Sequence, residues 1–240
     1  MKRNIFTLIL VFSVTSTLFS QVFTSFSVKG SLVETRLKNS IGKIETIIDE
    51  NSDIKNLDFK YKLNTGTSIS DSTPITKDFT KPQYIKLENA NEGKQTWEVA
   101  VNQLKSTTLP FALSFSNSSP IDIKTPNPKS WAGYGIDYKR ADAVYFCDEG
   151  VAFYIAFSPG AKVLDFSMSL LGKEEFIGEV GVETSTNFKN WSTIATYSAS
   201  KPILKSSTFT IPLKSDVKYV RWVYYTRVKQ NVTLNSISVK

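Results

Sequence analysis

The residues of this chain that could do chemistry are aromatic and cationic rather than nucleophilic. Trp131, Tyr134 and Tyr138 lie close together in a segment of mixed polarity that is rich in Gly and Pro. Sugar rings have apolar faces that stack on aromatic planes, and polar neighbours then fix the hydroxyl groups, a mixed lining that is typical of ligand sites. We therefore predict that these three residues bind a ligand. The alternative is an aromatic plug that closes one end of a β-sandwich.

A second group of candidates lies in the segment 218–227, "KYVRWVYYTR". Side chains alternate between the two faces of a strand, so this segment divides into an apolar face and a mixed face. The predicted core face holds Val220, Trp222 and Tyr224, and the outer face holds Tyr219, Arg221, Val223 and Tyr225.

The outer face of this segment has two possible roles. Arg221 and Tyr225 could form a ligand-recognition ridge, with Arg227 just beyond it to hold an acidic group. Alternatively, these side chains are solvated cross-strand pairs that stabilise the sheet. We include all three in the predicted ligand site.

The composition excludes several catalytic classes. The chain has no His and a single Cys, Cys147, so Ser-His-Asp triads, Cys-His dyads, His-containing zinc sites and thiolate metal sites are ruled out. Glycine-rich phosphate-binding motifs are also missing from the sequence. A glycoside hydrolase would need two carboxylates facing each other across a cleft, and the sequence cannot place any two together. We predict a protein without catalytic activity, cofactor or metal ion, with a carboxylate-based glycoside hydrolase as the least favoured alternative.

The first segment, residues 1–20, has the pattern of a secretory signal peptide. Lys2 and Arg3 precede a short apolar run, and small or polar residues lead to a plausible cleavage junction after Ser20. We therefore expect a secreted or cell-surface protein, with the periplasm as a further possibility. The apolar run is too short to span a bilayer comfortably, and no second long run follows, so no membrane insertion is predicted.

The net charge is +7, and removal of Lys2 and Arg3 with the signal would lower it to +5. The cationic residues are scattered, which mainly favours solubility and secondarily attraction to acidic glycans or an anionic surface. We do not predict nucleic-acid binding, because no module motif supports it.

Apolar and polar residues alternate along most of the chain, so we predict an all-β protein. In the first half, the predicted strands are "QVFTSFSVKG", "KIETIID", "LDFKYKL", "PQYIKLEN" and "QTWEVAVNQL". Trp97 is the predicted core anchor of the last of these. In the second half, we expect about eight antiparallel strands between Phe111 and Val239, with 125–138 as a long ordered loop.

The first half resembles the immunoglobulin-like repeats of bacterial secreted and surface proteins. The residues that carry the resemblance are "DFTKPQYIKL", the polar turn "NANEGK" and "QTWEVAV". The resemblance implies that residues 21–105 form an immunoglobulin-like sandwich that acts as a spacer.

The second half is similar to the galactose-binding-like jelly rolls that resemble carbohydrate-binding modules and are appended to bacterial extracellular enzymes and adhesins. The motifs are "WAGYGIDY", "VGVETSTNFKNWSTI", "YVRWVYYTR" and "NVTLNSISV". In the last motif, Asn235 and Ser236 stand where such domains often have two Asp residues, which weakens a structural calcium site there. The resemblance implies a jelly-roll β-sandwich over residues 106–240.

Taken together, these features predict a secreted binding protein with an immunoglobulin-like sandwich followed by a jelly roll. The expected partner is carbohydrate or another cell-surface component, as in adhesion. A structural or assembly subunit that binds other proteins is the alternative from a different functional class, and its mark would be a flat apolar patch or an open strand edge.

Overall fold

The computed structural model describes residues 22–89, 93–115, 128–136, 143–173 and 175–240. The predicted signal peptide and Tyr138 lie outside the described residues. Nearly all regular structure is β, which confirms the predicted fold class. The strands are β1 Phe23–Val28, β2 Arg36–Lys38, β3 Lys43–Ile48, β4 Phe59–Leu63, β5 Thr67–Ile69, β6 Gln83–Asn89, β7 Gly93–Gln103, β8 Phe111–Ser114, β9 Trp131–Tyr134, β10 Val144–Phe146, β11 Ala152–Ala156, β12 Val163–Leu171, β13 Ile177–Ser185, β14 Ser192–Tyr197, β15 Ser207–Pro212, β16 Tyr219–Lys229 and β17 Asn231–Val239.

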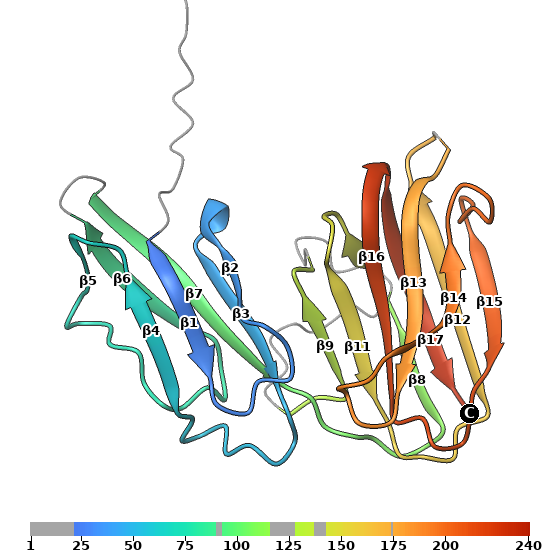
Figure 1. The fold of residues 1–240 in the computed structure, drawn as a ribbon, viewed down its shortest axis with the longest axis horizontal. Helices are drawn as coiled ribbons and strands as arrows, with labels where there is room; N and C mark the ends of the chain where they lie inside the picture. Colours follow the sequence, from blue (N-terminus) through green and yellow to red (C-terminus); the bar gives the residue numbers. More distant parts are fainter. Residues whose placement is uncertain (1–21, 90–92, 116–127, 137–142, 174) are drawn as a thin grey trace, which may run out of the picture.

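The strands form two β-sandwich lobes that lie side by side (Figure 1). In the first lobe, the sheet β2-β3-β7-β6-β5 packs against the two-stranded sheet β1-β4. Alternation along β7 turns Trp97, Val99 and Val101 into the core, where Trp97 is fully buried as predicted. Strands β3 and β7 pair in parallel, a feature that the alternating pattern does not reveal. The identification of this lobe as an immunoglobulin-like repeat stays a prediction.

The second lobe is a jelly-roll-like sandwich of two antiparallel sheets. One sheet has the order β14-β13-β16-β11-β9, and the other has the order β10-β17-β12-β15 with β8 also paired to β17. The large side chains between them include Phe153, Phe166 and Trp222, each at most 1% exposed. The predicted faces of β16 are confirmed, because Val220, Trp222 and Tyr224 are buried between the sheets.

One segment differs from the sequence-based expectation. Residues 131–134, "WAGY", are a strand and not part of a continuous loop, because they pair along β11 from Ile155 to Ala152. The segment is short and contains Gly133, so local propensity gives little sign of a strand. The pairing matters for the site, because it places β9 at the edge of the sheet beside the first lobe (Figure 1).

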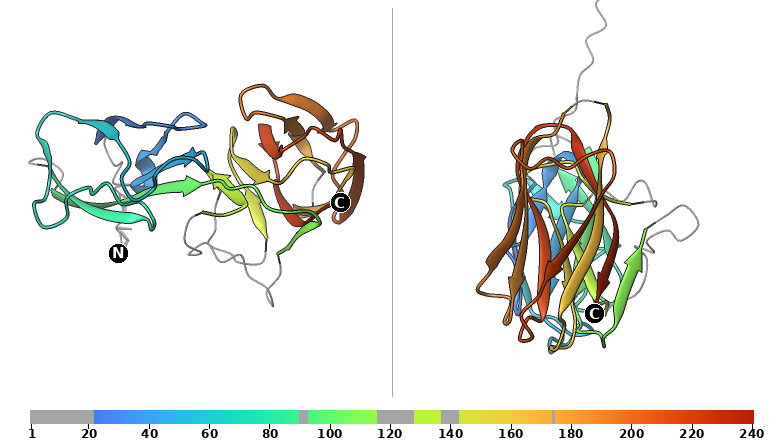
Figure 2. Two further views of the ribbon diagram at one scale, coloured as in Figure 1. Left: turned by 90° about the horizontal axis from the view of Figure 1, so that it is seen from below. Right: turned by 90° about the vertical axis from the view of Figure 1, so that its right-hand side faces the viewer.

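Hydrogen bonds at the junction help to fix the lobes to each other, and Figure 2 shows β7 running from the first lobe directly toward the second. After β7, the chain pairs with the segment before β9, since the Lys105 N–H donates to the Lys129 carbonyl at 2.8 Å and the Lys129 N–H donates to the Gln103 carbonyl at 3.0 Å. The Ser106 N–H also donates to the Glu50 carboxylate at 3.1 Å. The junction is therefore held by backbone hydrogen bonds rather than by a free linker.

An apolar cluster, which we call the inter-lobe cluster, also joins the lobes. Ile47 and Leu104 of the first lobe share it with side chains of β9, β11 and β16, and Ile47 is fully buried there. Leu32 and Val33 pack at its margin. Ile47 therefore belongs to the contact between the lobes rather than to the core of its own lobe.

Candidate functional site

A cavity of about 600 Å³ opens where the lobes meet, and we call it the inter-lobe cleft. Its volume lies within the range of ligand pockets. The first lobe contributes the segment 31–34, between β1 and β2. The second lobe contributes the other wall, from the outer face of its sheet and from two connections between strands. The sheet residues are Tyr134, Ala152, Tyr154, Arg221 and Val223, and the connections contribute Gly150, Phe188, Lys189 and Trp191.

Strand alternation explains how these side chains reach the cleft. On β11, Phe153 and Ile155 point into the sandwich, so Tyr154 and its small neighbours Ala152 and Ala156 point outward. On β16, Trp222 points inward, which turns Arg221 outward beside Tyr154. The small side chain of Ala152 leaves room above the sheet for the cleft, whereas Ala156 does not line it.

Three aromatic rings form the wall of the cleft. Phe188 stacks on Tyr154 with ring centroids 5.2 Å apart, and Trp191 meets Phe188 edge to face at 5.1 Å. The backbone supports this arrangement, because Phe188 has a positive φ of 64° and its carbonyl accepts the Trp191 Nε1 hydrogen at 2.9 Å. Phe188 is buried and Trp191 is half-buried, so the indole is the ring that faces the opening.

Arg221 is held in place by a carboxylate beneath it. The Arg221 Nε–H donates to Glu183 across the β13–β16 pair, and its guanidinium carbon lies 4.3 Å from the centre of the Trp191 ring. Glu183 is 7% exposed and also accepts hydrogen bonds from the hydroxyls of Tyr225 and Thr193. The ion pair neutralises the buried carboxylate and fixes the guanidinium against the indole.

The tyrosine hydroxyls around this network are kept protonated. Burial raises the pKa of Tyr154, with the charge of Arg221 acting in the opposite direction. Burial, and then the hydrogen bond to Glu183, raises the pKa of Tyr225 to about 12. Both hydroxyls are therefore neutral hydrogen-bonding groups near neutral pH.

The first lobe closes the opposite side of the cleft through contacts with β9. The Tyr134 hydroxyl donates to the Glu34 carbonyl at 3.0 Å, and the guanidinium of Arg36 lies 5.6 Å from the centre of the Tyr134 ring. The neighbouring Gly135 N–H donates to the buried Glu45 carboxylate at 2.9 Å, and Glu45 pairs with Lys43. These contacts set the width of the cleft.

The structure brings together part of the predicted ligand site. Tyr134 and Arg221 line the same cleft, and Tyr225 lies on the same sheet face, where it binds Glu183. Trp131 instead faces the core of the second lobe and stacks on Phe153 at 5.7 Å, with one edge at a neighbouring cavity. Arg227 is exposed near the end of β16, where its N–H donates to Glu149 and its Nε–H donates to Asn231. The role of these residues in binding stays a prediction.

Three residues that line the cleft were not among the candidates predicted from the sequence: Tyr154, Phe188 and Trp191. One signal could have found Tyr154: residues 151–157, "VAFYIAF", are apolar throughout, which indicates a strand covered on both faces. Phe188 lies in a turn whose backbone the sequence does not predict. Neither segment indicates that the first lobe covers the outer face of this sheet.

Within the described ranges, no group of three or more Cys, Asp or Glu residues is arranged to hold a metal ion. In the same part of the chain, no helix is long and apolar enough to cross a membrane.

Comparison with known proteins gives structural matches only. No family model matches the sequence, and no curated protein matches it. The structure is similar to a protein from Bacteroides thetaiotaomicron described as a "putative glycoside hydrolase", with a TM-score of 0.51 and 12% identity. That match covers 90% of this chain and 95% of the other, so the likeness in fold includes both lobes.

Smaller solved domains match about half of the chain. The K1 adhesin domain of Lys-gingipain from Porphyromonas gingivalis aligns with a TM-score of 0.40 and 15% identity, over 54% of this chain and 96% of that one. A family 29 carbohydrate-binding module from Piromyces equi aligns with a TM-score of 0.39 and 6% identity, over 54% of this chain and 88% of that one.

Proposed function

We propose that this protein is a non-catalytic carbohydrate-binding protein and that the inter-lobe cleft is its binding site. The observation that carries the proposal is the pairing of an aromatic wall with a fixed guanidinium in one cavity of about 600 Å³. A sugar ring needs an apolar plane for its C–H face and directional donors or acceptors for its hydroxyls. Trp191 supplies the plane, and the Arg221 guanidinium, which lies over one face of that indole, supplies donors.

The polar rim of the cleft suits a neutral or weakly acidic sugar. Ser31 and Glu34 lie on the wall from the first lobe, and Lys189 lies on the opposite wall. Hydroxyl, carboxylate and ammonium groups can each bind sugar hydroxyls. The cationic groups of Lys189 and Arg221 can also bind the carboxylate of an acidic sugar. The site would therefore recognise one or two sugar units through both lobes.

The proposal assigns Glu183 a positioning role rather than a catalytic one. Its two oxygens accept hydrogen bonds from Arg221, Tyr225 and Thr193, so the carboxyl group is already engaged within the protein. A general acid in glycoside hydrolysis must reach the glycosidic oxygen, whereas both oxygens of Glu183 are bound by neighbouring side chains. The proposal also includes secretion or display at the cell surface, where extracellular glycans are found.

A glycan-array screen of residues 21–240 tests the proposal, with Trp191→Ala as the site variant. The matched control is Tyr61→Ala, which removes an aromatic ring that is 41% exposed on the first lobe and does not line the cleft. Truncation of a central Trp commonly costs about 2 kcal/mol of binding free energy or more, which is about thirtyfold in affinity.

We expect the wild type and Tyr61→Ala to bind the same glycans and Trp191→Ala to lose them while keeping the wild-type circular dichroism spectrum. Equal binding by both variants would refute the cleft as the site. Absence of binding by folded wild type would shift support to a protein-binding subunit. Release of reducing sugar from a bound glycan would show that the protein is a hydrolase instead.

A further inference from the structure

A second cavity lies in the jelly-roll lobe and shares no lining residue with the inter-lobe cleft. It has a volume of about 720 Å³ and is formed by the end of β12, the start of β13 and the connection between β14 and β15. Seven of its eleven lining residues are apolar. Phe176 and Ile203 are almost fully buried at its base, whereas Leu204 is 60% exposed at its mouth.

Packing within the chain accounts for only part of the apolar lining, because Phe176 and Ile203 belong to the core of the jelly-roll lobe whereas two other apolar residues stay exposed. Leu204 and Ile177 both line the cavity and are 60% and 38% exposed, which is high for large apolar side chains that border a ready-made pocket. The Leu170 N–H donates to the Leu204 carbonyl at 3.2 Å, so the backbone holds the Leu204 segment over the end of β12. The cavity therefore has a structured wall on each side.

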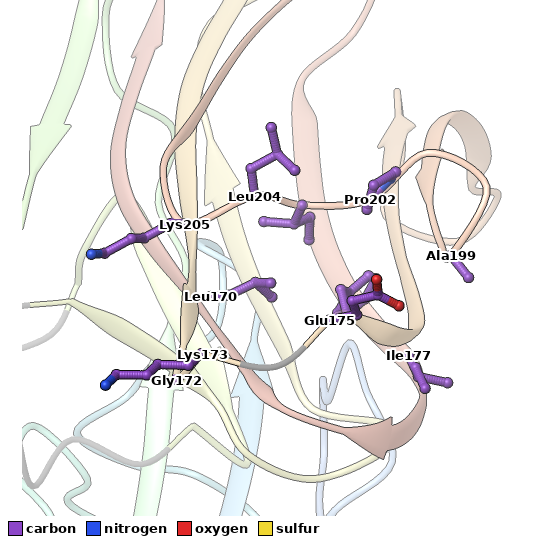
Figure 3. A pocket seen from close by; sticks show the side chains of 11 residues that line it. Leu170, Gly172, Lys173, Glu175, Ile177, Ala199, Pro202, Leu204 and Lys205 are labelled. Carbon is purple, nitrogen blue, oxygen red and sulfur yellow. The ribbon is translucent and has the colours of Figure 1, made fainter.

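The charged residues at the cavity are separated by sign. Figure 3 shows the ammonium groups of Lys173 and Lys205 extending to the same side, with Leu170 and Leu204 beside them, whereas Glu175 lies toward the other side. Neither lysine has an ion-pair partner among the described residues. An apolar cavity with two cations on one side matches a molecule with an apolar chain and an anionic end.

We propose that this cavity binds a free single-chain carboxylate of the fatty-acid class. The acyl chain would lie against Leu170, Phe176 and Leu204, and its carboxylate would lie between Lys173 and Lys205. The proposal is independent of carbohydrate binding, because the two cavities have no residue in common.

Isothermal titration calorimetry with octanoate, decanoate and dodecanoate, each below its micelle concentration, tests the proposal on residues 21–240. Each buried methylene contributes about 0.8 kcal/mol, so each step of two methylenes should tighten binding about fifteenfold. The double variant Lys173→Gln/Lys205→Gln should weaken dodecanoate binding about tenfold or more. Lys214→Gln, which changes an exposed lysine at a different cavity, should leave it unchanged.

A second variant and a second probe keep the outcomes distinct. Leu204→Ser alters an exposed wall residue without disturbing the core, and it should also weaken dodecanoate binding. Dodecanol should bind more weakly than dodecanoate. Absence of saturable one-to-one binding would overturn the proposal, as would equal binding by the lysine double variant. Binding to phosphatidylglycerol vesicles without binding to dodecanoate would also overturn it in favour of a membrane surface.

Discussion

Replacement of Ile47 by Ala should destabilise both lobes, although Ile47 belongs to the first. The side chain is fully buried in the inter-lobe cluster, where it packs with residues of β9, β11 and β16. The change removes three carbon atoms, which corresponds to about 2.4 kcal/mol of transfer free energy. The cavity left behind raises the expected loss in the free energy of unfolding to about 3 kcal/mol.

Two measurements test this effect. Urea unfolding gives the loss in overall stability, and hydrogen-exchange mass spectrometry gives the loss of protection in each lobe. With an m-value of about 3 kcal/mol per molar urea, the midpoint should fall by about 1 M. Peptides from β3 and from β9 should lose protection together, because the cluster joins them. The matched control is Ile41→Ala, which removes the same atoms from a side chain that is 54% exposed and should change stability by less than about 0.5 kcal/mol.

The reasoning would be refuted if β3 lost protection while β9 kept that of the wild type. Ile47 would then stabilise its own lobe alone, and the inter-lobe cluster would not couple the two. The cleft would in that case have walls that can move independently, which contradicts the fixed width inferred from the Tyr134 and Gly135 contacts.

Three further predictions concern the site and its surroundings. Gly135→Ala should lower the free energy of unfolding by about 1–2 kcal/mol more than Gly66→Ala in urea titrations, because both residues have positive φ but only at Gly135 would a Cβ meet Arg36 and buried Val151, within 2.9 Å. Glu183→Gln should cost about 2 kcal/mol in the same assay, since it leaves the partly buried Arg221 without its counter-charge. In spectrophotometric titration, the pKa of Tyr225 should also be lower in this variant than its value of about 12 in the wild type, because its hydrogen bond to the Glu183 carboxylate is lost. Finally, burial raises the pKa of Tyr197 and Tyr224 to about 12. The contribution of these two tyrosines to the free energy of unfolding should therefore be constant below pH 10 and fall between about pH 10 and 12, where the unfolded chain releases their protons first. Replacing each by Phe should flatten the pH dependence of stability in that range.

The sequence predicts most of the strands because their alternation reflects burial of one face. Both β7 and β16 show this, and the assignment of Trp97 and Trp222 to the cores follows from spacing alone. The prediction is wrong for β9, because that strand depends on pairing with β11 rather than on its own four residues. A strand of this kind becomes visible only when its partner is known.

The candidate site is less predictable because it depends on contacts between distant segments. Tyr134 and Arg221 could be selected as candidates from their residue types, but the cleft between them exists only because the segment 31–34 lies across the sheet. Trp131 looks equivalent to Tyr134 in sequence, yet its position on β9 turns it toward the core. Which aromatic residues face solvent is thus decided by strand register, which residue type does not reveal.

The central claim, that the inter-lobe cleft binds carbohydrate, is tested most directly by a crystal structure of residues 21–240 with the highest-affinity glycan from the array. The account predicts a sugar ring stacked on the Trp191 indole, with its hydroxyls bound by Arg221 and by the segment 31–34. A glycan bound elsewhere on the molecule, with the cleft unchanged, would contradict the account.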